Sequence, residues 1–173
     1  THQLVCERLG LPCYGSREAY DCLTDKSLFK KMVVECGLDI IPTYSADDPT
    51  SIEYPVLVKP TKAAGSMGMT VCYNAGQLDA AIKKAQETSR NGEYFIEKLM
   101  VGCQDFVVMY YTINGTPYLI KIGDRYLGKE EDGLSRQCAG TVCPSKYTQL
   151  YMEKYDEKVK DLIKKAGVTN GPT

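Results

Sequence analysis

The stretch that decides the fold is YPVLVKPTKAAGSMGM, residues 54–69. Residues 56–60 form an apolar run closed by a proline, which predicts a strand. Lys59 stands near the end of this run, where burial of its aliphatic stem restricts the position of the ammonium group. Gly65 and Gly68 follow it, and such glycines let backbone amides approach an anion closely. A cation beside a glycine loop predicts a triphosphate cradle; the alternative interpretation is a mobile hairpin loop with a surface lysine.

Two familiar phosphate-binding motifs are excluded by the order of these residues. A P-loop requires Gly-x-x-x-x-Gly-Lys-Ser/Thr, and the sequence contains no such run. A protein kinase places its glycine loop before its strand lysine, whereas here Lys59 precedes the glycines.

A second candidate segment is YFIEKLM, residues 94–100. An apolar strand that ends in a carboxylate offers a slot for a flat base. Glu97 is a candidate acceptor for an exocyclic amine, with the backbone just after it pairing with the ring edge, and Asp105 is a candidate acceptor for ribose hydroxyls. Taken singly, Glu97, Lys98 and Asp105 are typical of solvent-facing strand positions. Their combination with Lys59 and the glycine loop favours a nucleotide site.

The rest of the sequence mixes short strands with amphipathic helices. The first ~20 residues contain turn-forming glycines and a proline, and indicate a connector. Thr24 is expected to cap a helix that stops at Gly37. Asn114-Gly115 is the strongest hairpin signal. Strands are expected at 40–44, 56–60, 70–73, 93–100, 106–112 and 117–122, helices at 25–36, from 78 to near 91 and around 159–166, and a polar loop at 124–143. This order predicts an α+β fold with antiparallel pairing.

The bulk composition excludes several classes of partner. With 43% apolar residues, 25% charged residues and a net charge of -1, the chain has no long-range attraction to nucleic acid or an anionic membrane. No signal peptide or membrane-spanning run is present in the sequence. Eight cysteines without a Cys-x-x-Cys pair, and the single His2, argue against a zinc site and predict reduced thiols in a cytoplasmic protein. Cys138 and Cys143 remain the candidates for redox or metal chemistry.

Four motifs together resemble a known family. Asp25-Lys26 at a helix start, residues 54–60, the Gly65-to-Gly68 loop and Phe95-Ile96-Glu97-Lys98 occur in the order and near the spacing of the ATP-grasp superfamily. The sequence looks most similar to the large chain of carbamoyl-phosphate synthase and related carboxylate–amine ligases, with biotin carboxylase as a more distant cousin. The resemblance runs from about residue 9 to the end of the chain.

The resemblance implies a role for each matching residue. Lys26 and Lys59 match the two basic residues that hold the nucleotide phosphates, and residues 65–68 match the lid loop over the β- and γ-phosphates. Glu97 and the backbone of residues 98–100 match the adenine-binding hinge, and Asp105 stands where the family usually has a ribose-binding Glu. The expected ATP-binding residues are Lys26, Lys59, Gly65, Ser66, Met67, Gly68, Glu97, Lys98, Leu99, Met100 and Asp105.

The implied fold is a partial ATP-grasp fold of the α+β class, with a lid subdomain and an antiparallel core sheet flanked by helices. Residues 1–24 would connect to a missing N-terminal domain. Residues 25–100 would form the helical entry and the lid subdomain with its glycine loop. Residues 101–173 would begin the core subdomain, which would stop before the metal ligands.

The implied chemistry is that of an ATP-dependent carbon–nitrogen ligase. In the family, ATP phosphorylates a carboxylate or bicarbonate, and an amine attacks the acyl phosphate, a reaction that depends mostly on positioning and charge neutralisation. The family's Mg²⁺ ligands, a Glu and a Glu-x-Asn pair, normally follow the Gly171-Pro172-Thr173 region, and residues 124–143 offer no substitute. We therefore expect no metal ligand and no catalytic residue in this chain, which would bind nucleotide weakly or through phosphate contacts alone and would not turn over.

Two alternatives stay open. The first keeps the fold without catalysis, as a nucleotide-sensing or scaffolding module. The second is an α+β interaction module in which Lys59 and the glycine loop are incidental. Carboxylate and amine substrates, and Mg²⁺, belong to the complete enzyme in the leading interpretation.

Overall fold

The computed structural model describes residues 2–63, 65–128 and 138–173. The chain forms two compact units. Unit 1 comprises Thr1–Ile40, Gln104–Tyr126 and Gly140–Thr173, and unit 2 comprises Ile41–Cys103 and Leu127–Ala139. Each unit has its own hydrophobic core.

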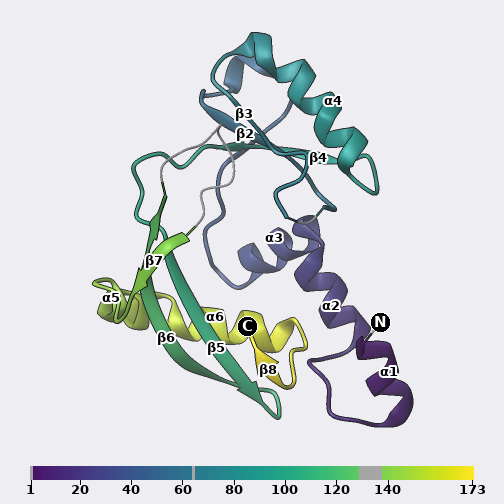
Figure 1. Ribbon diagram of the computed structural model, residues 1–173, viewed down its shortest axis with the longest axis vertical. Helices are drawn as coiled ribbons and strands as arrows, with labels where there is room; N and C mark the ends of the chain where they lie inside the picture. The colour runs from purple at the N-terminus through teal and green to yellow at the C-terminus, as the bar shows by residue number, and fades with distance from the viewer. Residues whose placement is uncertain (1, 64, 129–137) are drawn as a thin grey trace. The chain divides into compact units, whose positions relative to one another are not determined.

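Unit 2 is built on a four-stranded antiparallel sheet in the order β1-β4-β2-β3. The strands are β1 (Thr43–Tyr44), β2 (Val56–Pro60), β3 (Thr70–Cys72) and β4 (Tyr94–Lys98). The helix α4 (Leu78–Thr88) lies across this sheet (Figure 1), and two short 3-10 helices, η1 (Pro49–Ser51) and η2 (Ala75–Gln77), complete the unit. The predicted strand at 56–60 and the predicted amphipathic helix from residue 78 are both confirmed.

Alternation along β2 gives the sheet two different faces. Val56 and Val58 are fully buried against α4, together with Ile96 of β4 and Leu78 of the helix. Each such aliphatic side chain contributes roughly 1.5–3 kcal/mol of burial free energy. Leu57 and Lys59 point to the opposite face, because successive side chains of a strand alternate. That second face carries the candidate site.

Unit 1 is built on a second sheet in the order β7-β6-β5-β8. Its strands are β5 (Phe106–Ile113), β6 (Thr116–Leu127), β7 (Cys138–Val142) and β8 (Gly171–Pro172), and its helices are α1 (His2–Leu9), α2 (Arg17–Thr24), α3 (Lys26–Glu35), α5 (Thr148–Lys154) and α6 (Asp156–Lys165). Asn114 and Gly115 join β5 to β6 with φ of 48° and 77°, as a two-residue turn with two left-handed positions requires. The predicted hairpin is confirmed.

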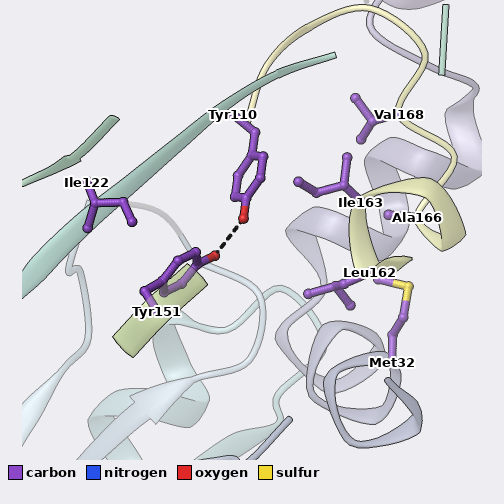
Figure 2. Close-up of a cluster of buried hydrophobic side chains, with 8 residues drawn as sticks. All are labelled: Met32, Tyr110, Ile122, Tyr151, Leu162, Ile163, Ala166 and Val168. Carbon is purple, nitrogen blue, oxygen red and sulfur yellow. Dashed lines mark hydrogen bonds between the residues drawn. The ribbon is translucent and has the colours of Figure 1, made fainter. Parts of the chain in front are cut away.

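The core of unit 1 brings together α3, α6 and the β5–β6 hairpin (Figure 2). Met32 comes from α3, Leu162 and Ile163 from α6, and Ile122 from β6. Tyr110 is buried among them, and its hydroxyl donates to the carboxylate of Asp156 at 2.6 Å. The same hydroxyl lies 2.9 Å from the hydroxyl of Tyr151, as the dashed line in Figure 2 marks. The buried polar groups are thus bonded to one another, as a packed core requires.

The structure differs from the expected elements near the N-terminus. Residues 2–9 and 17–24 are helical, so the prediction of a connector without secondary structure is wrong there. Ser16 caps α2 by accepting from the Ala19 amide, a local signal that outweighs the turn-forming residues before it. Asp25, and not Thr24, caps α3, because its carboxylate accepts from the amides of Ser27 and Leu28, whereas the Thr24 hydroxyl donates to the Tyr20 carbonyl inside α2.

Two further differences concern the second half of the chain. The expected polar loop at 124–143 contains the end of β6 and all of β7, while residues 129–137 lie outside the described part of the chain. The helix α5 was not predicted. The compact units also do not follow the expected division at residues 24 and 100, because α3 packs in the unit 1 core. Within the described residues, no helix combines the length and the apolar character needed to cross a membrane.

Candidate nucleotide site

The centre of the candidate site is an ion pair between Lys59 of β2 and Glu97 of β4. The two strands are antiparallel neighbours in which Leu57 faces Glu97 and Lys59 faces Phe95. This register puts the lysine and the glutamate diagonally across one face of the sheet, the face that α4 does not cover. Only 2% of the Glu97 side chain and 19% of the Lys59 side chain are exposed.

The burial of this pair follows from the sequence around it. The stem of Lys59 lies in an apolar strand, and the neighbouring positions on the same face, Leu57 and Phe95, are half-buried. A carboxylate removed from water in this way requires a partner, and the Lys59 ammonium supplies it. Lys59 and Glu97, which the sequence indicated as separate candidates, therefore form one ion pair.

The glycine loop follows β2 directly. Gly65, Ser66 and Gly68 have φ of 64°, 60° and 72°, so three residues of the loop occupy the left-handed region. Glycine adopts this region without strain, whereas serine does so at a cost of about 1 kcal/mol or more. Met67 is exposed at the tip. Tight turns of this kind occur in the backbone loops that bind anions.

The end of α4 holds the glycine loop in place. A Cβ at Gly68 would lie 2.6 Å from the Cβ of Thr88, so only glycine lets the loop approach the helix here. The side chain of Lys84 donates to the Met69 carbonyl at 3.5 Å. Gly65, in contrast, has no atom within 4 Å of an added Cβ. One side of the loop is thus fixed on the helix and the other is open.

A buried polar cluster ties the start of the loop to the chain after α4. Thr61 donates its hydroxyl to the Asn91 side chain at 2.8 Å, and Ser89 donates to the same oxygen at 2.7 Å. The Thr61 amide donates to the Glu93 carbonyl at 3.1 Å. The sequence interpretation missed this cluster, although Ser89-Arg90-Asn91-Gly92 is the kind of polar run that forms such turns.

The hinge after Glu97 is partly engaged in the sheet. The amide of Lys98 donates to the Pro42 carbonyl at 3.0 Å and the amide of Leu99 donates to the Pro55 carbonyl at 3.1 Å. Both donors are therefore committed within unit 2, and Met100 is exposed. The Lys98 side chain turns away to Glu53, at 2.8 Å, and this contact lowers the pKa of the Glu53 carboxyl and raises the pKa of the Lys98 ammonium.

The remaining predicted residues, Lys26 and Asp105, belong to unit 1. Lys26 is the first residue of α3, next to the capping Asp25. Asp105 pairs with Arg125 of β6 at 3.2 Å, and the Arg125 amide also donates to the Asp105 carbonyl at 2.8 Å. Asp105 is thus held by a guanidinium that is not among the expected ATP-binding residues. The structure brings Lys59, Glu97 and the glycine loop together in unit 2, whereas these two residues stand on the other unit.

No metal centre accompanies the site among the described residues. Across residues 2–63, 65–128 and 138–173, no three His, Cys, Asp or Glu side chains gather closely enough to hold an ion. Cys138 and Cys143 are both exposed. The acidic residues at 130–132 lie outside the described part of the chain.

Comparison with known proteins identifies the family. Residues 52–173, which include the ion pair, the glycine loop and the hinge, match the family described as ATP-grasp domain. The chain belongs to the ATP-grasp family. The expected α+β fold with antiparallel sheets and flanking helices is thereby confirmed as a partial ATP-grasp fold.

Relatives of this ATP-grasp chain include the carbamoyl phosphate synthase large chain of Archaeoglobus fulgidus, 27% identical over 114 residues, a match that covers 61% of this chain and 11% of that protein. Among solved structures, the biotin carboxylase β,γ-ATP complex of Campylobacter jejuni has a TM-score of 0.79 at 20% identity, covering 96% of this chain and 40% of that one. The biotin carboxylase domain of the 2-oxoglutarate carboxylase of Hydrogenobacter thermophilus, solved with MgADP and bicarbonate, has a TM-score of 0.77 at 20% identity and coverage of 96% and 39%.

These matches define the extent of the likeness. The chain spans about a tenth of the length of the carbamoyl phosphate synthase relative and about two fifths of the two carboxylase chains. At 20% identity the structural neighbours establish the ATP-grasp fold, and the named relatives are ATP-grasp enzymes of the ligase type.

Proposed function

We propose that this chain binds ATP through the face of the unit 2 sheet opposite α4 and through the glycine loop that follows β2. The observation that carries the proposal is the Lys59–Glu97 pair, a nearly buried charge pair at the foot of a loop with three left-handed residues. Lys59 would hold the phosphates as a flexible point charge, and the amides of residues 65–68 would close over them.

The base would lie along the hinge. Glu97 has a carboxylate that accepts from an exocyclic amine, and the chain after it continues in an extended path. Because the amides of Lys98 and Leu99 are already bonded to carbonyls of unit 2, we expect Met100 to supply the backbone donor for the ring edge. Lys26 and Asp105 belong to unit 1 and stay predictions from the resemblance, the first for phosphate and the second for the ribose.

We further propose that the whole protein is an ATP-dependent carbon–nitrogen ligase that acts in the cytoplasm. It would activate a carboxylate or bicarbonate as an acyl phosphate, which an amine then attacks. The role of the residues in this chain would be to bind and orient the nucleotide and to neutralise its charge. Mg²⁺, held by residues other than those described here, would neutralise further phosphate charge in the complete enzyme.

Calorimetric titration with ADP and with a non-hydrolysable ATP analogue tests the binding proposal. Lys59→Met should weaken both ligands by at least about tenfold, equivalent to about 1.4 kcal/mol. Lys83→Met is the matched control, because Lys83 is an exposed lysine on α4 in the same unit. Equal affinity in the wild type and the folded Lys59→Met variant would show that the site has been placed wrongly.

The ligase proposal needs a separate test on the full-length protein. ATP hydrolysis that depends on Mg²⁺ and on an added carboxylate or bicarbonate would support it. Nucleotide binding without turnover, with every acceptor tried, would instead support the alternative of a non-catalytic nucleotide-binding module.

A further inference from the structure

The Lys59–Glu97 pair places two different recognition groups in contact with each other before any ligand is present. The ammonium is the group that suits a phosphate, and the carboxylate is the group that suits an N–H donor. Both lie on the face of the sheet opposite α4, on adjacent strands of unit 2. The inference that follows rests on the proposed nucleotide function of this face.

The unequal burial of the two partners decides what happens when an anion approaches. The lysine is the more accessible partner, with 19% of its side chain exposed against 2% for the glutamate. Its four-carbon stem is flexible, so the ammonium is able to turn toward an incoming phosphate. The carboxylate stays in its buried position, where a charge without its partner is costly.

A ligand therefore meets a different cost according to the groups it carries. An inorganic polyphosphate draws the ammonium away and offers nothing to Glu97. A nucleotide with an exocyclic amine offers a phosphate to Lys59 and an N–H donor to Glu97, so each charged group exchanges one partner for another. The local charge also matters, because the carboxylate repels any phosphate that comes close to the ammonium.

We propose that the Lys59–Glu97 ion pair is a selectivity device that disfavours phosphates lacking a base. Glu97 acts as a positioning residue that holds the Lys59 ammonium. The ion pair separates when a ligand offers a phosphate to Lys59 and an N–H donor to Glu97. In this arrangement the two ends of the nucleotide bind cooperatively, and free polyphosphate is a weak competitor.

The experiment compares inorganic tripolyphosphate with the non-hydrolysable ATP analogue on the wild type and on Glu97→Gln. Gln removes the negative charge but keeps a carbonyl that accepts from an amine. We expect Glu97→Gln to bind tripolyphosphate about tenfold more tightly than the wild type does, and the ATP analogue to change by less than about threefold. The gain must disappear in the double variant Lys59→Met/Glu97→Gln, and Glu87→Gln, at an exposed position of α4, must leave both affinities unchanged.

A measurement on the wild type tests the proposal even if Glu97→Gln does not fold. With ¹³C-labelled lysine, the ε-methylene signal of Lys59 should shift with the ATP analogue at concentrations where tripolyphosphate leaves it in place. An equal shift with the two ligands would overturn the proposal, and so would an unchanged or weaker affinity of Glu97→Gln for tripolyphosphate.

The outcomes separate this inference from the proposed function. If the wild type binds the ATP analogue through Lys59 but Glu97→Gln gains nothing, only the selectivity device is lost. In the second case, Glu97→Gln gains tripolyphosphate binding through Lys59 while the wild type does not bind the ATP analogue. Glu97 then disfavours phosphate binding to Lys59 as proposed, but the ATP proposal fails.

Discussion

At the scale of single residues, the buried carboxylate of Glu97 makes Lys59 important for stability as well as for binding. Lys59→Met should lower the free energy of unfolding by about 3 kcal/mol, because it leaves a carboxylate that is 2% exposed without its ammonium partner. Lys59→Met/Glu97→Gln should recover at least half of that loss. Urea denaturation measures both, and equal stability of the single and double variants would contradict the argument.

Hydrogen exchange adds a control for the same residue. The amides of Val58 and Ile96 in the unit 2 core should exchange faster in Lys59→Met, whereas Lys83→Met on the exposed side of α4 should change the unfolding free energy by less than about 0.5 kcal/mol.

A second residue-scale prediction concerns Tyr110. Burial raises the pKa of its hydroxyl, and the hydrogen bond to Asp156 raises that pKa further. Above a pH of about 10 the unfolded chain loses this proton while the folded chain keeps it, so stability should fall by about 1.4 kcal/mol per pH unit for this group. Tyr110→Phe should remove that part of the slope and, at neutral pH, cost about 1–3 kcal/mol because Asp156 loses a donor.

The measurement is urea denaturation between neutral pH and the alkaline range. Tyr118→Phe is the control, since Tyr118 is exposed on β6 and its removal should leave the slope unchanged. An unaltered slope in Tyr110→Phe would mean that the buried hydroxyl is not the group that titrates.

At the scale of elements, the approach of the glycine loop to α4 distinguishes two glycines of similar backbone conformation. Gly65→Ala and Gly68→Ala both place a Cβ at a left-handed position, which costs about 1 kcal/mol. Only Gly68→Ala meets Thr88, at 2.6 Å, and must move the loop away from the helix. We expect Gly68→Ala to weaken the ATP analogue at least about fivefold more than Gly65→Ala does. Calorimetry on both variants tests this, and equal losses would show that the contact with α4 does not position the loop.

At the scale of the whole molecule, the distribution of acidic residues leads to a prediction about metal dependence. Among the described residues, no three acidic, histidine or cysteine side chains gather closely enough to hold an ion, and the resemblance predicts that this chain lacks the Mg²⁺ ligands. The affinity of this chain for ADP should therefore change by less than about threefold when EDTA replaces Mg²⁺. Titrations under both conditions measure it. A tenfold or larger gain with Mg²⁺ would mean that this chain supplies metal ligands.

The local elements of this molecule were largely predictable because their signals lie within a few residues. The left-handed pair Asn114-Gly115 fixed the hairpin, and the apolar run of residues 56–60, closed by a proline, predicted the strand. The apolar stripe of residues 78–85 gave α4. The helices α1 and α2 were missed because Gly10, Pro12 and Gly15 are strong turn signals and Ser16 is a single capping residue among them.

The sequence alone thus determined the hairpin, the strand with Lys59, the glycine loop and the resemblance to ATP-grasp proteins, because spacing along the chain carries each of them. Only the tertiary structure decided that Lys59 and Glu97 form one pair, since their contact depends on β4 lying beside β2 in one particular register. It also decided that α3 packs with α6 and the β5–β6 hairpin in the core of unit 1. Contacts between distant segments are set by which apolar faces bury each other, and no local pattern encodes that choice.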